Sequence, residues 1–190
     1  MIKFVSKIYA FESGDGAEAA YKQARAELIA KSPRAAEVIK AVEAAPHVIE
    51  VVISTTVGQE SAFRGAMGDE TASKLVWDPK HAFQILVDPT QITKKVLGRD
   101  VTTTQAKLSP LPANLVLIHE LGHAEQFLGK MPNYAKLFAS GKDGIAVIEA
   151  DNLKETEWPV CEAYGVAKRS NYLHYNGSSD PVVSKWKKID

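Results

Sequence analysis

The feature of the sequence that most constrains the fold is the motif His-Glu-Leu-Gly-His at positions 119–123, inside a strongly apolar run that begins at Leu115. Residues four apart lie on one face of an α-helix, so His119 and His123 would present two imidazoles at a separation that one cation can span. Glu120 would lie one step around the helix, where a carboxylate can take a proton from a metal-bound water. The motif therefore predicts a helix that carries part of a catalytic metal site.

The residues on either side of the motif are typical of helix ends. Pro112 and Asn114 favour a helix start, and Gly129 followed by Pro132 favours a stop. Burying two imidazoles and a carboxylate in so apolar a segment is costly unless a partner compensates, and a cation is the simplest such partner. The alternative is a buried helix whose two histidines are satisfied by hydrogen bonds alone.

Length and charge favour one domain and exclude some classes of partner. The chain has 190 residues, of which 45% are hydrophobic, enough for a single well-packed domain over residues 1–190. The 23 Lys and Arg balance the 23 Asp and Glu, so no basic field favours nucleic acid. No stretch predicts a membrane span, and no signal peptide is predicted, so export is expected to use another route. Cys161 is the single cysteine and is interpreted as a small buried residue.

Hydrophobic periodicity and turn residues divide the chain into short strands and helices. Before the motif, the predicted elements are a strand at 3–11, a turn at 12–16, two helices within 17–45 separated at Ser32-Pro33, a strand at 47–55, a loop at 58–73, and two strands at 74–79 and 82–89 that form a hairpin. Residues 91–112 are predicted to be an exposed connection. After the motif helix, the predicted elements are a short helix at 133–138, a turn at 140–144 and a largely helical segment at 145–174 around Pro159.

A catalytic metal site needs a third protein ligand and an open position for water. The acidic candidates in the segment after the motif are Glu149, Asp151, Glu155, Glu157 and Glu162. Glu157 falls on the apolar face of this segment, where an unpaired carboxylate would be costly, so it is the predicted ligand. Glu155 points away from that face. Glu162 lies next to the face and is the alternative.

The chain also resembles a known family. The residues that carry the resemblance are the motif helix at 118–124, Trp77-Asp78-Pro79 before it, and the segments 148–152, 156–162 and 169–172 after it. They are similar to the NleD-like zinc metallopeptidases, bacterial effector proteases that include zincin domains fused to the C-terminus of type VI secretion spike (VgrG) proteins. The order of elements matches from about residue 17 to residue 175. The resemblance implies a zincin-like α+β fold, in which a small mixed or antiparallel sheet packs on helices that include the motif helix.

Carried onto this chain, the resemblance implies Zn²⁺ as the metal. It implies roles for six residues, with the zinc ligands first, then the base and the pair that contacts the scissile carbonyl: His119, His123 and Glu157; Glu120; Arg169 and Tyr172. The family often has two adjacent acids at the third-ligand position. Here Trp158 follows Glu157, which keeps Glu162 as the alternative ligand.

Motif and resemblance together predict a zinc-dependent metallopeptidase that acts as a secreted bacterial effector or toxin. Zinc would activate a water, Glu120 would take its proton, and the hydroxide would attack a peptide carbonyl. The expected partners are a protein or peptide substrate, with residues 82–87 as a candidate edge strand for backbone pairing, and a secretion spike as fusion or carrier. Delivery by a specialised secretion system into a target cell or its periplasm is expected.

Two alternative functions stay open. One is a zinc-stabilised binding module of zincin fold without turnover, and Glu120 argues against it because a structural site needs no base. The other is a toxin whose zinc site hydrolyses something other than peptide.

Overall fold

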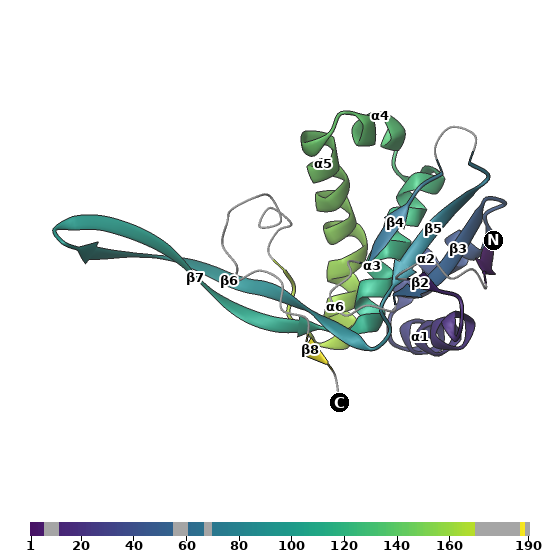
Figure 1. The fold of residues 1–190 in the computed structure, drawn as a ribbon, viewed down its shortest axis with the longest axis horizontal. Coiled ribbons are helices and arrows are strands. Elements are labelled where there is room, and N and C mark those ends of the chain that lie inside the picture. The colour runs from purple at the N-terminus through teal and green to yellow at the C-terminus, as the bar shows by residue number, and fades with distance from the viewer. Residues whose placement is uncertain (6–11, 55–60, 67–69, 170–186, 189–190) are drawn as a thin grey trace.

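A computed structural model describes residues 1–5, 12–54, 61–66, 70–169 and 187–188. A body made of one sheet and several helices carries a long two-stranded arm that extends to one side (Figure 1). Among the described residues, no helix combines the length and the apolar character that crossing a membrane would require.

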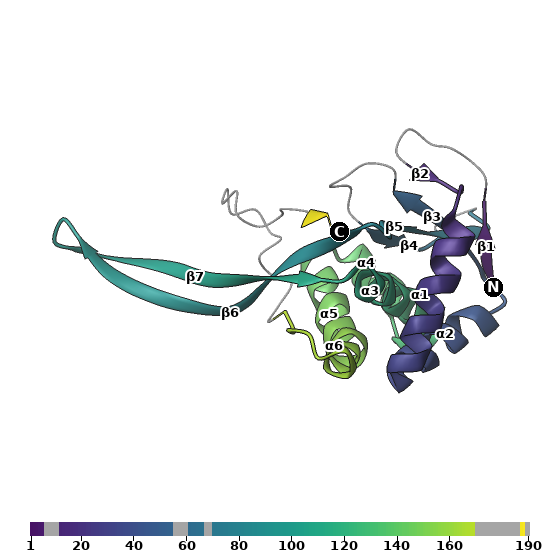
Figure 2. The same ribbon diagram turned by 90° about the horizontal axis from the view of Figure 1, so that it is seen from below.

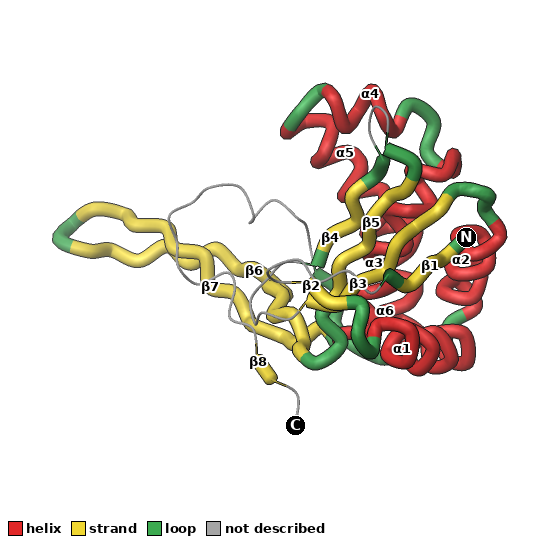
Figure 3. The backbone as a smooth tube through the Cα atoms, turned by 45° about the vertical axis from the view of Figure 1, so that its right-hand side comes forward, coloured by secondary structure: helices red, strands yellow, loops and turns green. Residues whose placement is uncertain are grey.

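The body contains a five-stranded mixed sheet. Its strands are β1 (Ile2–Phe4), β2 (Glu12–Ser13), β3 (Val48–Ser54), β4 (Ala62–Arg64) and β5 (Ala72–Trp77). They follow the order β1-β3-β5-β4, with β2 pairing with the end of β3. The pairs β1–β3 and β3–β5 are parallel, whereas β4 runs antiparallel to β5. Figure 3 shows β4 at the edge of this sheet, beside β5.

The helices that cover the sheet lie on one of its faces (Figure 2). They are α1 (Ala17–Lys31), α2 (Pro33–Ala44), α3 (Ala113–Glu125), α5 (Lys142–Asn152) and α6 (Trp158–Tyr164). A short α4 (Tyr134–Ala139) connects the segment η1 (Gln126–Lys130), in which Gly129 breaks the helical path with φ of 117°, to α5. A π-helical turn, η2 (Leu153–Glu157), joins α5 to α6. The fold is therefore α+β, with a small mixed sheet packed on helices that include the motif helix, as predicted.

Helix α3 is the centre of the core. All its residues from Leu115 to Glu125 are buried, so the rest of the body encloses this helix on every side. Strands β3 and β5 face it with alternate residues, among them Val51 and Leu75, as the two-residue period of a strand requires. Trp77 on β5 fixes the start of the helix, because its Nε1 donates a hydrogen bond of 2.6 Å to the carbonyl of Ala113.

The break between the first two helices is where it was predicted. Ser32 caps α2 by accepting a hydrogen bond from the amide of Ala35, and Pro33 occupies the first turn, where its missing N–H is not needed. The strand predicted at 47–55 and the short helix predicted at 133–138 are likewise confirmed as β3 and α4.

The predicted hairpin between residues 74–79 and 82–89 is wrong. Strand β5 pairs on its two sides with β3 and β4, so β6 (His81–Val96) pairs instead with β7 (Arg99–Leu111) and, at its start, with β8 (Lys187–Lys188). The predicted connection at 91–112 is thus mostly strand. Strand β6 continues past Pro89 because the ladder shifts register between Val87 and Thr90, which accommodates a residue that cannot donate.

Other boundaries differ from prediction in smaller ways. The predicted turn at 12–16 contains β2, the predicted loop at 58–73 contains β4, and the first strand ends at Phe4, with residues 6–11 outside the described part of the chain. The C-terminal helix ends at Tyr164, well before residue 174, because Gly165 adopts a left-handed conformation with φ of 65°.

Close packing of α5 against α3 depends on Gly122. A Cβ atom there would lie 2.0 Å from Oδ1 of Asn152 and 3.0 Å from Cγ2 of Thr156. Both side chains are buried, and Asn152 is held by its hydrogen bond of 2.8 Å to the carbonyl of His119. Neither neighbour can therefore move aside cheaply.

We predict that Gly122→Ala destabilises the protein by about 1–3 kcal/mol through overpacking. Helix propensity alone predicts the opposite change, because alanine stabilises a helix by about 0.8–1.0 kcal/mol relative to glycine. A loss of stability would therefore show that overpacking is the larger effect. Chemical denaturation of both proteins measures the difference. Ala150→Ser, on the exposed side of α5, is the control and should change the unfolding free energy by less than about 0.5 kcal/mol. A Gly122→Ala protein more stable than wild type would contradict the packing argument.

Candidate metal centre

Helices α3 and α5 bring three ligand atoms to one point in the core. Nε2 of His119 lies 3.1 Å from Nε2 of His123, and the two nitrogens lie 3.4 and 3.3 Å from Oε2 of Glu149. All three side chains are buried. These are the residues of the described chain whose ligand atoms could together hold a metal ion.

The spacing of the three atoms fits a bound ion. Donors about 2.0–2.1 Å from a tetrahedral ion lie about 3.3–3.4 Å from one another, close to the separations seen here. Oε2 of Glu149 is buried, and none of the described residues donates a hydrogen bond to it. A buried carboxylate oxygen without a donor is costly, and a cation between it and the two imidazoles would supply the partner. The site therefore fits a metal ion held by His119, His123 and Glu149.

A glutamine sets the tautomer of His123. The amide nitrogen of Gln126 donates to the carbonyl of Ile148 at 2.9 Å and to a carboxylate oxygen of Asp151 at 2.7 Å. Its Oε1 therefore faces Nδ1 of His123, 3.0 Å away, and must accept the hydrogen bond. With Nδ1 as the donor, Nε2 keeps a lone pair directed at the cluster.

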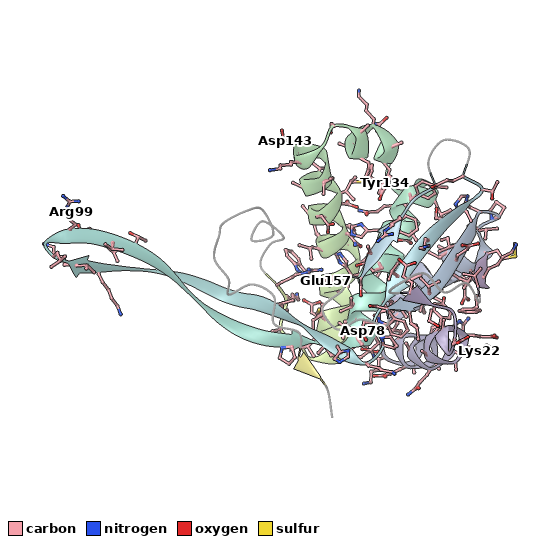
Figure 4. All side chains as sticks on the ribbon, viewed as in Figure 1. Lys22, Asp78, Arg99, Tyr134, Asp143 and Glu157 are labelled. Atoms are coloured by element: carbon pink, nitrogen blue, oxygen red, sulfur yellow. The ribbon has the colours of Figure 1, made fainter. Side chains whose placement is uncertain are left out.

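A buried carboxylate lies behind His119. Oε2 of Glu157 is 2.9 Å from Nδ1 of His119, an atom that Nη2 of Arg169 and Nδ2 of Asn152 also approach, at 3.0 and 3.2 Å. When Nδ1 donates to Glu157, Nε2 has its lone pair free for a metal. Glu157 is fully buried and is held by Arg169, whose Nε donates to Oε1 at 2.9 Å and whose Nη2 donates to Oε2. Figure 4 shows Glu157 inside the body, near the root of the arm.

Neighbouring charges lower the pKa values of Glu149 and Glu157, which favours the ionised form of both carboxylates. Burial acts to raise the pKa of Glu157, but Arg169 and His119 outweigh it and lower the pKa to about 2. Burial acts in the same way on Glu149, and the two histidines again lower its pKa. Burial and Arg169 act to lower the pKa of His119, but Glu149 and Glu157 raise it to about 9. The negative potential that holds a proton on His119 also favours a cation in its place.

Glu120 lies beside this cluster and is anchored by the edge of the sheet. Its Oε2 accepts a hydrogen bond of 2.8 Å from the amide of Phe63 on β4. Burial raises the pKa of Glu120, against the opposing effect of His119 and His123. A carboxylate whose pKa is raised in this way is suited to proton transfer near neutral pH.

Glu157, the predicted third ligand, is not one of the three clustered residues. Glu157 was expected to complete the site, but it contacts Nδ1 of His119, on the opposite side of the ring from the three clustered atoms, and its charge is paired with Arg169. The alternative, Glu162, is exposed and paired with Lys168. Glu149 replaces both as the candidate ligand.

Arg169 also lies in a different place from the one predicted. It follows the end of α6 and sits behind His119, where it holds Glu157. The shared helical face expected for Arg169 and Tyr172 is therefore wrong for Arg169, and Tyr172 lies outside the described residues.

Helical spacing contains a signal for Glu149. Glu149, Asn152 and Thr156 are three and then four residues apart, and all three are buried against α3. Glu149 is four residues before Leu153, so the two residues lie on the same face of a helix, and this spacing places Glu149 on the apolar face. The π-helical turn that follows, Leu153–Glu157, shifts the phase between Glu149 and the apolar residues of α6, which hides the pattern from a strict 3.6-residue repeat.

An aromatic pocket of about 360 Å³ adjoins the cluster. Its lining includes Phe63, whose amide binds Glu120, together with Phe127, Tyr134 and Phe138. The rings pack on one another, with centroids 5.6 Å apart for Phe63 and Phe127 and 5.9 Å apart for Phe127 and Tyr134. Burial, Glu149 and Glu120 together raise the pKa of Tyr134 to about 12, so the pocket wall lies within the electrostatic reach of the site.

Comparisons of the chain with protein families, with curated proteins and with solved structures found no match. The geometry of the site is therefore the basis on which a function can be argued.

We predict that Glu149→Gln lowers the metal content of the purified protein, because it removes a ligand. Glu157→Gln should keep the full content at saturating metal but weaken affinity by roughly 10–100-fold, because it changes only the partner of a ligand. Metal analysis and a chelator competition measure the two effects.

Glu162→Gln is the matched control and should change neither quantity. Circular dichroism confirms that each variant is folded before its metal is counted. Full metal content in Glu149→Gln, with loss in Glu157→Gln, would restore Glu157 as the ligand.

Proposed function

We propose that the protein is a zinc-dependent metallopeptidase with a zincin-like fold. The observation that carries the proposal is the buried group of His119, His123 and Glu149 next to a second buried carboxylate, Glu120. A group that only stabilised the fold would need no base at its side.

The donor set favours zinc over other common ions. Two imidazole nitrogens and one carboxylate oxygen are typical ligands of catalytic zinc, whereas calcium and magnesium prefer oxygen ligands throughout. Three protein ligands leave a fourth position of a tetrahedron for water or substrate. A zinc ion bound there supplies Lewis acidity, which lowers the pKa of a coordinated water from about 15.7 towards about 7.

The roles of the protein groups follow from their positions. Glu120 takes a proton from the attacking water and returns it to the leaving amine, and its raised pKa brings it closer to neutral pH for both transfers. Glu157 and Arg169 orient His119 rather than contact the substrate. Tyr172 is retained from the sequence as the group that contacts the scissile carbonyl.

Strand β4 is a second candidate, beside residues 82–87, for pairing with a peptide. Residues 83–87 of β6 pair with β7 on one side, and β4 pairs with β5 on one side at the edge of the described sheet. The amide of Phe63 points away from β5 and toward Glu120, so a peptide running along this edge would pass the base. The aromatic pocket beside Phe63 suits a large apolar side chain of that peptide.

The proposed biological role rests on the sequence resemblance. It makes the protein an effector or toxin of the NleD-like group, delivered by a specialised secretion system as a fusion to, or cargo of, a spike protein. The binding module without turnover is the competing function.

We predict that Glu120→Gln binds as much zinc as wild type but hydrolyses peptides at least about 100-fold more slowly, because proton transfer by a positioned group contributes about 10²–10⁴-fold. The measurement is mass spectrometry of new N-termini in a peptide library digested by the zinc-loaded protein, with kcat/KM then measured on a cleaved peptide. New termini should lie next to large apolar residues.

Glu162→Gln, an exposed acid on α6, is the control and should cleave as wild type does. Equal rates for Glu120→Gln and wild type would rule out this mechanism. A fully zinc-loaded wild type that generates no new termini would favour the binding module.

A further inference from the structure

The arm formed by β6 and β7 extends far beyond the core. Past the register shift at Val87 and Thr90, the ladder continues for seven residues of β6, up to the pair Val96–Arg99. At about 3.3 Å per residue this part is roughly 20 Å long, and it projects away from the body in both views (Figures 1 and 2). A two-stranded ribbon in water is at best marginally stable on its own, so the arm contributes little to the stability of the fold.

The turn at the tip is unfavourable for a hairpin in water. Leu97 and Gly98 have φ values of 49° and 80°, the pattern of a two-residue type I′ turn. The first position of such a turn favours Asn, Asp or Gly, because other side chains are strained at positive φ. Leu97 is in addition 99% exposed. The tip thus presents a strained leucine entirely to solvent, which neither folding nor solubility explains.

One face of the tip combines apolar and basic side chains. Val96 is the cross-strand partner of Arg99, and Lys94 is the partner of Val101 two positions further along. Partners share a face and the faces alternate along a strand, so these four residues lie together next to Leu97. Val96 and Val101 are 51% and 41% exposed, and both cations are exposed. Figure 4 shows Arg99 at the far end of the arm.

The opposite face is polar, and its side chains pair with one another across the two strands. Lys95 lies across from Asp100, a favourable pair of opposite charges. The hydroxyls of Thr93 and Thr102 are 3.0 Å apart and hydrogen-bonded. The two faces of the tip therefore differ in chemistry, and only the face with Val96 and Arg99 combines exposed apolar groups with unbalanced positive charge.

We propose that the tip docks on an anionic lipid bilayer, with Leu97 and its valine neighbours inserted at the interface and Lys94 and Arg99 at the level of the headgroups. Apolar side chains beside cations are the arrangement by which peripheral proteins bind anionic membranes. This inference does not depend on the chemistry of the metal centre.

Other occupants fit the tip less well. A second copy of the chain would bring Lys94 and Arg99 of both copies together, and like charges that meet repel. A protein partner usually covers about 800 Å² on each side, more than the convex end of a two-stranded ribbon offers, whereas a fluid interface can surround a convex tip.

The test compares vesicles of phosphatidylcholine alone with vesicles that also contain phosphatidylserine, using the full chain in a sedimentation assay. Wild type should bind the mixed vesicles, and bind them less well as salt is added. Leu97→Asn should weaken binding at least about tenfold, through loss of the inserted side chain. Because Asn-Gly is a preferred type I′ pair, this variant should fold at least as well as wild type, which separates docking from folding.

Two further variants complete the test. Reversing both cations, in Lys94→Glu with Arg99→Glu, should also weaken binding by at least about tenfold, since each basic residue contributes about fivefold. Val147→Asn removes an exposed apolar side chain on α5 and should bind as wild type does. The proposal is overturned if wild type does not bind the mixed vesicles, if it binds neutral vesicles equally well, or if Leu97→Asn binds undiminished. A protein captured by the tip in the absence of vesicle binding would also overturn it.

Discussion

The close approach of α5 to α3 is the contact on which the site depends. Gly122 lets the two helices touch, and Asn152 fills the space that a Cβ would occupy while bonding the carbonyl of His119. This contact brings Glu149, one turn earlier on α5, to within 3.4 Å of both imidazoles. A residue with no side chain therefore positions a candidate ligand that lies 27 residues away in the sequence.

Charge balance explains why so polar a group can be buried. Among the described residues around His119, the buried carboxylates of Glu120, Glu149 and Glu157 face the guanidinium of Arg169. If all are ionised, two negative charges remain, and a divalent cation between neutral imidazoles would cancel them. Arg169 and the cation would then act on opposite sides of one ring, with Glu157 beside Nδ1 and Glu149 beside Nε2. Removing either Arg169 or the cation would leave a buried carboxylate unpaired, and an unpaired carboxylate costs far more in the core than in water.

The sequence predicts the parts of the site that depend on local pattern and misses those that depend on packing between elements. The motif helix, its burial and the pair His119 and His123 follow from spacing within one helix. Periodicity also predicts that Glu157 is buried, but it cannot distinguish a carboxylate that binds a metal from one that binds an arginine. That distinction depends on Arg169, which reaches Glu157 only because Gly165 ends α6 early. The hairpin of residues 74–89 failed for a similar reason, since both edges of β5 are taken by β3 and β4, which the spacing along the chain does not reveal.

The arm and the metal centre are mechanically connected through the start of α3. At the root of the arm, Ala82, Ile85 and Leu111 are buried in the core, and Ala113 begins the motif helix two residues after β7 ends. The carbonyl of Ala113 is also held by Trp77, so the root cannot rotate freely against the body. Docking of the tip, as inferred from Leu97, would therefore fix how the whole body stands above a membrane rather than deform the site. On that view the arm determines which side of the protein, and so which end of the β4 edge, meets a substrate at the bilayer surface.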